Sequence, residues 1–116
     1  MHILRNAGPE GLSRDPEALS TGRNSGYQAM NLALLAGASR VILIGYDAKE
    51  PAAGQAAHWF GEHPRMTPVS AFAMYRQSFK NGAAAIKAAG LRVINSSPGS
   101  AIECFERMEL EQALRL

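Results

Sequence analysis

The chain has 116 residues, of which 47% are hydrophobic, so it can bury one core and is not globally disordered. Its formal net charge is +2, and its lysine and arginine residues are scattered, which argues against a nucleic-acid-binding surface. Cys104 is the single cysteine, so an internal disulfide is excluded, and the chain opens without a signal-peptide core. These features predict one domain over residues 1–116 in the cytoplasm.

The first half of the chain predicts a strand, a loop, a helix and a second strand. Residues 3–4 predict a short strand, and the stretch 7–22, rich in Gly, Pro and Ser, predicts a loop. A polar cap precedes a helix over about 26–37, whose apolar residues cover most of its circumference. Residues 41–45 are an unbroken apolar run, which is typical of a parallel strand covered on both faces.

The second half opens with a long loop over residues 48–67, and loops of this length are often functional. Apolar residues then recur at steps of three or four and predict a helix over about 68–89. Residues 91–95 predict another strand, and a terminal helix is expected over about 107–115.

The predicted order of elements is βαβαβ, and right-handed crossovers would place about three short strands in a mostly parallel sheet flanked by helices. The expected fold class is a three-layer α/β domain, in the form of a partial Rossmann-like domain. Ligands of such sheets bind beyond the carboxyl ends of the strands. Asp47, the loop 58–64 and residues 95–97 all follow strands, so we expect them at one edge of the sheet. The turn at residues 21–26 can reach the same edge.

That turn, Thr-Gly-Arg-Asn-Ser-Gly, is a candidate phosphate-binding segment. Its glycines permit close backbone approach, and the start of a helix offers free N–H groups and a positive dipole to an anion. Arg23 could pair with a phosphate through two hydrogen bonds. The alternative is an ordinary helix N-cap with a flexible lead-in, because short Gly/Ser turns are common and the Gly-Lys-Ser/Thr of a P-loop is not present.

A second cluster is His58-Trp59-Phe60-Gly61-Glu62-His63-Pro64. Two histidines and a carboxylate can perform acid–base chemistry, and the tryptophan can stack on a base or sugar. The alternative is a loop held by its aromatic residues, with exposed histidines. The histidine spacing does not match a helical zinc pair, so no metal site is predicted. Asp47 could hold a ribose hydroxyl or a metal-bound water, or it could form a loop hydrogen bond.

Several of these segments resemble known families. Asn24-Ser25-Gly26, the apolar helix after it, and Ile42-Leu43-Ile44-Gly45-Tyr46-Asp47 resemble a stretch shared by two related groups. These are the bacterial family-42 sialyltransferases, which use a CMP-activated sugar, and the 6-hydroxymethylpterin diphosphokinase-like proteins, which use a nucleoside triphosphate. Nearly the whole chain is similar to a group of phage and prophage proteins with the same core. The resemblance implies the carboxyl half of a larger family member, without its amino-terminal nucleotide-binding segment.

The resemblance also implies roles for the matching residues. The Asn-Ser-Gly turn corresponds to the turn near the nucleotide, and Arg23 falls close to a basic residue of the sialyltransferases. Trp59 and His63 take the places of a phosphate-contacting tyrosine and the general base, so His63 is the candidate catalytic residue. The complete predicted nucleotide- or phosphate-binding set is Arg23, Asn24, Ser25, Gly26, Asp47, His58, Trp59 and Asn95.

The sequence therefore predicts a nucleotide- or nucleotide-sugar-binding domain like the carboxyl half of a sialyltransferase-like glycosyltransferase, with catalytic machinery that half a cleft can leave incomplete. One alternative is a diphosphokinase-like phosphotransferase that uses Mg²⁺ and Asp47. Another is a non-catalytic phage assembly or interaction module. An open sheet edge predicts self-association or a partner chain. Nucleic acid is not an expected partner, because the lysine and arginine residues are scattered. A membrane is not expected either, because the most apolar stretch, 29–46, contains Asn31 and Arg40.

Overall fold

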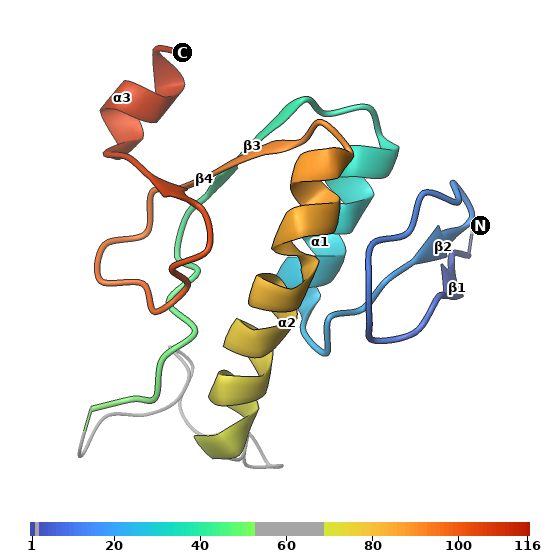
Figure 1. Cartoon of the computed structure of the whole chain (residues 1–116), viewed down its shortest axis with the longest axis horizontal. Coiled ribbons are helices and arrows are strands. Elements are labelled where there is room, and N and C mark those ends of the chain that lie inside the picture. Colours follow the sequence, from blue (N-terminus) through green and yellow to red (C-terminus); the bar gives the residue numbers. More distant parts are fainter. Residues whose placement is uncertain (2, 53–68) are drawn as a thin grey trace.

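The computed structural model describes residues 1, 3–52 and 69–116 (Figure 1). It is a small α/β structure with short parallel sheets. In chain order the elements are β1 (Arg5–Asn6), β2 (Ala18–Leu19), α1 (Ser25–Leu35), β3 (Arg40–Leu43), α2 (Val69–Ala88), β4 (Arg92–Asn95), β5 (Glu106–Arg107) and α3 (Leu110–Leu114).

The main sheet has three parallel strands in the order β3-β4-β5, and β1 pairs with β2 in a separate two-stranded sheet. In Figure 1 the main sheet lies between the α1–α2 pair and α3. Within the described residues, no strand pairs with the outer side of β3, which therefore forms one edge of the main sheet. The predicted short parallel sheet is confirmed, whereas the second sheet was not predicted.

At the ends of the chain, one prediction is wrong and another holds with different bounds. The first strand is Arg5–Asn6, and it pairs with β2 inside the stretch expected to be a loop, because Arg5 N–H donates to Glu17 O at 2.7 Å and Ala7 N–H to Leu19 O at 2.8 Å. The terminal helix expected over about 107–115 is confirmed as α3, but it is shorter, because β5 occupies Glu106–Arg107. A paired Arg92 and Glu106, with nitrogen–oxygen distances of 3.0 Å, hold β5 beside β4.

The hydrophobic core lies between the two long helices and one face of the main sheet. The rings of Tyr27 in α1 and Phe79 in α2 meet with their centroids 5.4 Å apart. Gly82 makes this approach possible, because a Cβ there would lie 2.1 Å from the Tyr27 hydroxyl oxygen. The buried cluster consists of Tyr27, Met30, Leu43, Phe79, Ile86, Leu91, Val93 and Ile102.

The buried side chain of Asn31 holds the amino-terminal segment on α1. It is completely buried, and its Oδ1 accepts hydrogen bonds from Ser13 N–H at 3.1 Å and Ser20 N–H at 2.9 Å. Its Nδ2 donates to Ser13 O at 2.9 Å. Because buried amides need partners, these three bonds fix the chain that leads into the turn at 21–26.

Candidate functional site

A hollow of about 630 Å³ lies where the start of α1 meets the end of β3. It brings together four residues of the predicted nucleotide-binding set: Asn24, Ser25, Gly26 and Asp47. Side chains of α2 complete the wall, including the rings of Phe72 and Tyr75. The turn that precedes α1 and the residues that follow β3 therefore meet at one place, as the βαβ order predicts.

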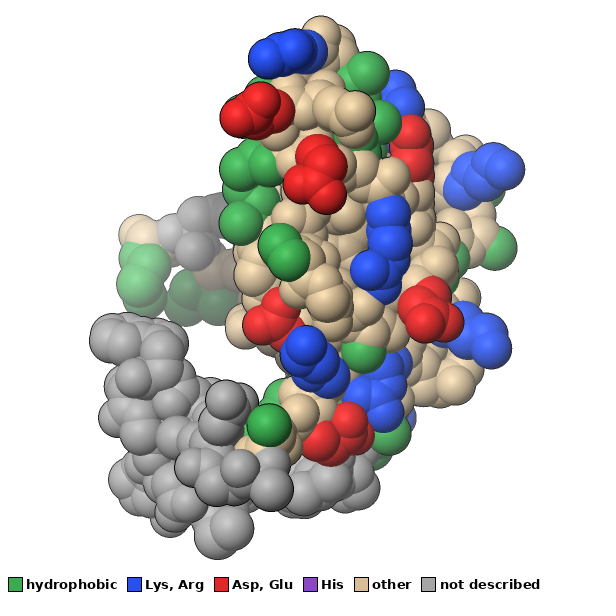
Figure 2. Space-filling view, turned by 90° about the vertical axis from the view of Figure 1, so that its left-hand side faces the viewer, with side chains coloured by type: hydrophobic (Ala, Val, Ile, Leu, Met, Phe, Trp, Pro, Cys, Tyr) green, Lys and Arg blue, Asp and Glu red, His purple; other side chains and the backbone are tan. Residues whose placement is uncertain are grey.

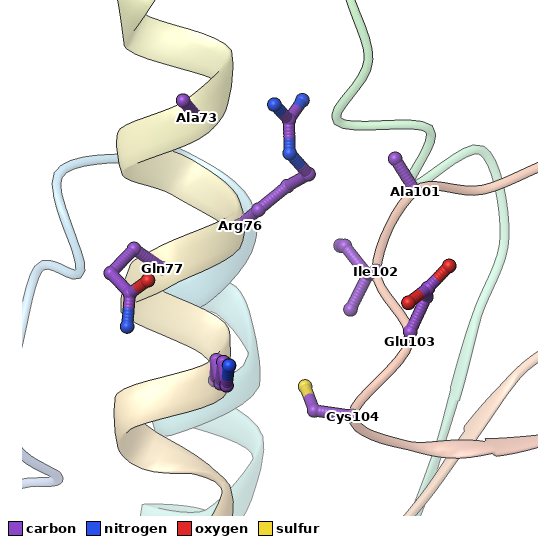
Figure 3. Close-up of a pocket in the computed structure, with 8 residues that line it drawn as sticks. Ala73, Arg76, Gln77, Ala101, Ile102, Glu103 and Cys104 are labelled. Carbon is purple, nitrogen blue, oxygen red and sulfur yellow. The ribbon is translucent and has the colours of Figure 1, made fainter.

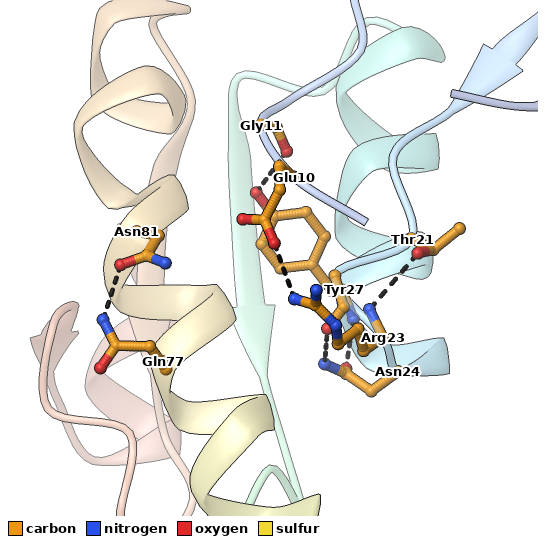
Figure 4. Close-up of polar contacts among 9 residues, drawn as sticks. Glu10, Gly11, Thr21, Arg23, Asn24, Tyr27, Gln77 and Asn81 are labelled. Carbon is orange, nitrogen blue, oxygen red and sulfur yellow. Dashed lines mark hydrogen bonds and ion pairs between the residues drawn. The ribbon is translucent and has the colours of Figure 1, made fainter. Parts of the chain in front are cut away.

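The start of α1 is capped by Asn24, as Figure 4 shows. Its backbone is extended, and its Oδ1 accepts the N–H of Tyr27 at 2.8 Å, while its Nδ2 donates to Gly22 O at 2.8 Å. Within the described part of the chain, the N–H groups of Ser25 and Gly26 donate no hydrogen bond. The cap thus satisfies one amide of the first turn and leaves two amides at residues that line the hollow.

Arg23 does not reach the hollow. Its guanidinium pairs with Glu10 at 2.7 Å, in the loop that leads to β2 (Figure 4). The backbone of Arg23 is left-handed, with a φ of 61°, and this conformation turns the chain immediately before the cap. Arg23 is therefore paired with Glu10 and is not among the residues that line the hollow.

Tyr46 fixes the start of α1 against the end of β3. Its hydroxyl donates to Gly26 O at 3.1 Å, and its ring stands edge-on to Phe79 at 6.0 Å. A Cβ on Gly26 would lie 2.7 Å from Cε1 of Tyr46, so this position needs glycine for close packing as well as for any ligand. Burial raises the pKa of the Tyr46 hydroxyl, which keeps it a neutral donor.

Asp47 ends at the edge of the hollow with an exposed side chain. Its backbone carbonyl accepts the N–H of Ala101 at 2.8 Å, which ties it to the segment after β4. Among the described residues its carboxylate accepts no hydrogen bond and forms no ion pair. The carboxylate can therefore accept hydrogen bonds from a ligand.

Asn95 lies at the same edge of the sheet, but its side chain is used inside the fold. It is 2% exposed, and its Nδ2 donates to Ser100 Oγ at 2.9 Å and to Ile102 O at 3.1 Å. Its Oδ1 accepts the N–H of Ser97 at 3.0 Å. Ser97 Oγ in turn accepts the N–H of Tyr46 at 2.9 Å. Asn95 therefore organises the turn after β4 and does not line the hollow.

Three predicted residues, His58, Trp59 and His63, lie outside the described residues. Among the described residues there is no group of three or more His, Cys, Asp and Glu side chains that could hold a metal ion. Among the described residues, Asp47 is a predicted carboxylate that lines the hollow.

A second hollow, also of about 630 Å³, lies between α2 and residues 101–104 (Figure 3). Arg76 borders it and donates to Ala48 O at 2.7 Å and to the Glu50 carboxylate at 3.2 Å. The hydrogen bond to the carboxylate lowers the pKa of Glu50. Burial raises the pKa of the Cys104 thiol, which therefore stays protonated and is a poor nucleophile. No sequence pattern singled out Arg76, which is one of several polar residues on α2.

Comparison of the chain with family models, curated proteins and solved structures found no match in any of the three. No helix in the described ranges is long and apolar enough to cross a membrane. The hollow at the start of α1 and the residues that line it are therefore the main indication of function.

Proposed function

We propose that this protein binds a nucleotide or a nucleotide-sugar in the hollow at the start of α1. One observation carries the proposal: Ser25, Gly26 and Asp47 line the same hollow, and among the described residues the amides of Ser25 and Gly26 and the carboxylate of Asp47 have no hydrogen-bond partner. Amides at the start of a helix bind phosphate oxygens, and a carboxylate after a parallel strand binds ribose hydroxyls.

The aromatic residues of α2 add a surface for the base or the sugar. Phe72 and Tyr75 line the hollow, and their rings stand edge-on at 6.0 Å. Aromatic faces offer large contact areas to planar rings. The volume of about 630 Å³ falls within the roughly 300–1,000 Å³ that small-molecule sites occupy.

A Rossmann-like relation and a three-layer architecture are part of the same proposal. The parallel order β3-β4-β5 and the position of the hollow at the end of β3 support them. The proposal can be extended from binding to catalysis, with sialyltransferase-like sugar transfer and His63 as the base. This extension depends on the resemblance alone. The proposal assigns binding to the described residues and leaves transfer as a separate step.

A thermal-shift panel tests the proposal. The chain is incubated with CMP, CTP, ATP, GTP, UDP and a CMP-sugar, each with and without Mg²⁺. A cytidine ligand at one hundred times its dissociation constant should stabilise the fold by about 2.7 kcal/mol. If ATP is the only nucleotide that stabilises the chain, and does so only in the presence of Mg²⁺, a phosphotransferase is favoured instead. If no nucleotide stabilises the chain, the proposal is wrong and an interaction module is favoured.

Asp47→Asn provides the matched test within that panel. It removes the carboxylate but keeps the size of the side chain, so it should weaken the nucleotide-induced shift. Glu17→Gln is the control, because it makes the same charge change on an exposed residue that does not line the hollow. Equal shifts for the two variants would exclude Asp47 from the site.

We also propose that the protein associates with a second copy of itself through the open edge of β3. Among the described residues the outer side of β3 carries no paired strand, and the next residue, Ile44, is 60% exposed. Open strand edges present unpaired backbone groups to another chain. Sedimentation at micromolar concentration should detect a dimer, and a monomer would contradict the proposal.

A further inference from the structure

The turn that carries Asp47 continues through a residue with an unfavourable backbone conformation. Ala48 has a φ of 47°, in the left-handed region, and it lines the nucleotide hollow together with Asp47. Residues with a Cβ adopt this conformation at a cost, and they keep it where neighbouring contacts hold them there. The conformation of Ala48 directs the chain as it leaves Asp47, so the contact that holds Ala48 also shapes the rim of the hollow.

Arg76 supplies that contact. Its Nη1 donates to Ala48 O at 2.7 Å and to Oε2 of Glu50 at 3.3 Å, and its Nη2 donates to Oε1 of Glu50 at 3.2 Å. In Figure 3 the Arg76 side chain extends away from the axis of α2. One planar guanidinium therefore fastens two points of the segment 48–50 to α2, and charge-assisted hydrogen bonds of this kind are stronger than those between neutral groups.

The other side of Asp47 is fixed by the segment after β4. Asp47 O accepts the N–H of Ala101 at 2.8 Å, and the N–H of Tyr46 donates to Ser97 Oγ at 2.9 Å. Asp47 thus lies between two anchors, of which one is the segment after β4 and the other is Arg76 on α2. Because the Asp47 carboxylate accepts no hydrogen bond among the described residues, these backbone anchors set its place at the hollow.

Arg76 is not placed to bind phosphate itself. It is not among the residues that line the nucleotide hollow, and it borders the neighbouring hollow instead. Its charge is paired with Glu50, and the hydrogen bond between them lowers the pKa of the Glu50 carboxyl, which therefore stays ionised at neutral pH. Figure 2 shows acidic and basic side chains interspersed over one face of the molecule, and a surface of this kind exerts no broad attraction on an anion. The contribution of Arg76 is therefore geometric.

We infer that Arg76 is a positioning residue of the nucleotide site. By holding the carbonyl group of Ala48, it keeps the chain after β3 in the conformation that presents the Asp47 carboxylate to the ribose. A ligand binds more tightly to a turn that is already ordered than to one that it must first order. The role in binding rests on the proposed function, whereas the contact between Arg76 and Ala48 belongs to the free protein and can be tested without a nucleotide.

Amide hydrogen exchange of the ¹⁵N-labelled chain without nucleotide tests the contact. Arg76→Gln removes the charged donor, so the Ala101 amide, which donates to Asp47 O, should exchange about tenfold faster relative to the buried Ile94 amide of β4. Lys80→Gln is the matched control. It removes a positive charge from α2 at the same hollow but, among the described residues, forms no hydrogen bond with the segment 48–50. It should leave the relative exchange rate unchanged.

The affinity for a nucleotide tests the role in binding, at a temperature at which every variant is folded. The probe is CMP, or ATP with Mg²⁺ if that is the nucleotide that stabilises the chain. Arg76→Gln should weaken binding about three- to tenfold, as expected if the competent turn is populated about a third to a tenth of the time. In an Asp47→Asn background the same change should cause no further loss, because Arg76 acts through Asp47.

Each unexpected result has a distinct meaning. Equal exchange of the Ala101 amide in Arg76→Gln and Lys80→Gln would overturn the contact itself. Additive losses of affinity in the double variant would point to direct contact of Arg76 with the nucleotide and would overturn the positioning role, as would an unchanged affinity of Arg76→Gln. If exchange is faster as expected but no nucleotide binds the natural chain, the proposed function is wrong, and the role of Arg76 in binding is overturned with it.

Discussion

Two polar turns at the carboxyl edge of the main sheet are similar in sequence but differ in use. Residues 21–26 and residues 95–100 both contain Asn, Ser and Gly, together with Thr and Arg in the earlier turn and Pro in the later one. In the later turn the carboxamide of Asn95 makes three internal hydrogen bonds. In the earlier turn Asn24 caps α1, and the amides of Ser25 and Gly26 keep no partner among the described residues. The internal hydrogen bonds of each turn, and not its residue types, therefore distinguish a structural turn from a candidate binding turn.

The largest effect should come from the structural turn. Asn95→Ala removes three hydrogen bonds and leaves the buried N–H of Ser97 without a partner, so it should lower the free energy of unfolding by about 3 kcal/mol. Asn24→Ala removes a helix cap and should lower it by about 1 kcal/mol. Urea denaturation of both variants measures the difference. Equal losses would break the contrast between the two turns.

Gly26→Ala tests how closely the binding turn is packed. The new Cβ would meet the ring of Tyr46 at 2.7 Å, and the resulting displacement should lower the free energy of unfolding by about 2 kcal/mol. Alanine is otherwise better in a helix than glycine by about 1 kcal/mol. In a Tyr46→Ala background the same change should therefore be neutral or stabilising, and a cost that persists there would exclude the ring as its cause.

Alkaline pH tests the burial of the tyrosines that border the binding turn. Burial raises the pKa of both Tyr27 and Tyr46 above the ordinary value of 10.0. The folded state then holds these protons more tightly than the unfolded state, so stability is retained below pH 10.0 and falls as the pH rises through the raised pKa. Denaturation midpoints across this range should fall less steeply for Tyr46→Phe. An unchanged slope would show that the Tyr46 hydroxyl is not buried.

The smallest effect is expected at Arg23. Its guanidinium is paired with Glu10 on an exposed surface and lies outside the hollow, so Arg23→Gln should change nucleotide affinity by less than about twofold and stability by less than about 0.5 kcal/mol. Calorimetric titration measures the affinity. A tenfold loss of affinity would mean that Arg23 leaves Glu10 when the ligand binds. Arg23 would then add a positive charge to the binding turn that the turn after β4 lacks.

Much of the fold can be predicted from the hydrophobic pattern of the sequence. Periodicity and stop signals predict a helix over about 26–37, observed as Ser25–Leu35, and one over about 68–89, observed as Val69–Ala88. The two apolar runs become β3 and β4. The strands β1, β2 and β5 have two residues each, so no alternation can mark them, and they form through partners distant in the sequence.

The candidate site is predictable to a similar degree. The order of elements and the rule that ligands bind at strand ends are sufficient to bring Ser25 and Asp47 to one hollow. The ion pair of Arg23 with Glu10 and the internal bonds of Asn95 depend on three-dimensional neighbours. The Ser96 hydroxyl, which is buried without a partner among the described residues, could likewise not be predicted, because serine is common in turns after strands.

The most direct measurement compares the affinity of Ser25→Pro and Ser25→Ala for the nucleotide that the panel identifies. Proline suits the first helical position and the extended backbone of Asn24, so Ser25→Pro should fold normally while it deletes the amide of residue 25. Ser25→Ala deletes only the hydroxyl. The account predicts a loss of about tenfold or more for Ser25→Pro and none for Ser25→Ala. Equal affinities for the two variants would contradict phosphate binding by the first turn of α1.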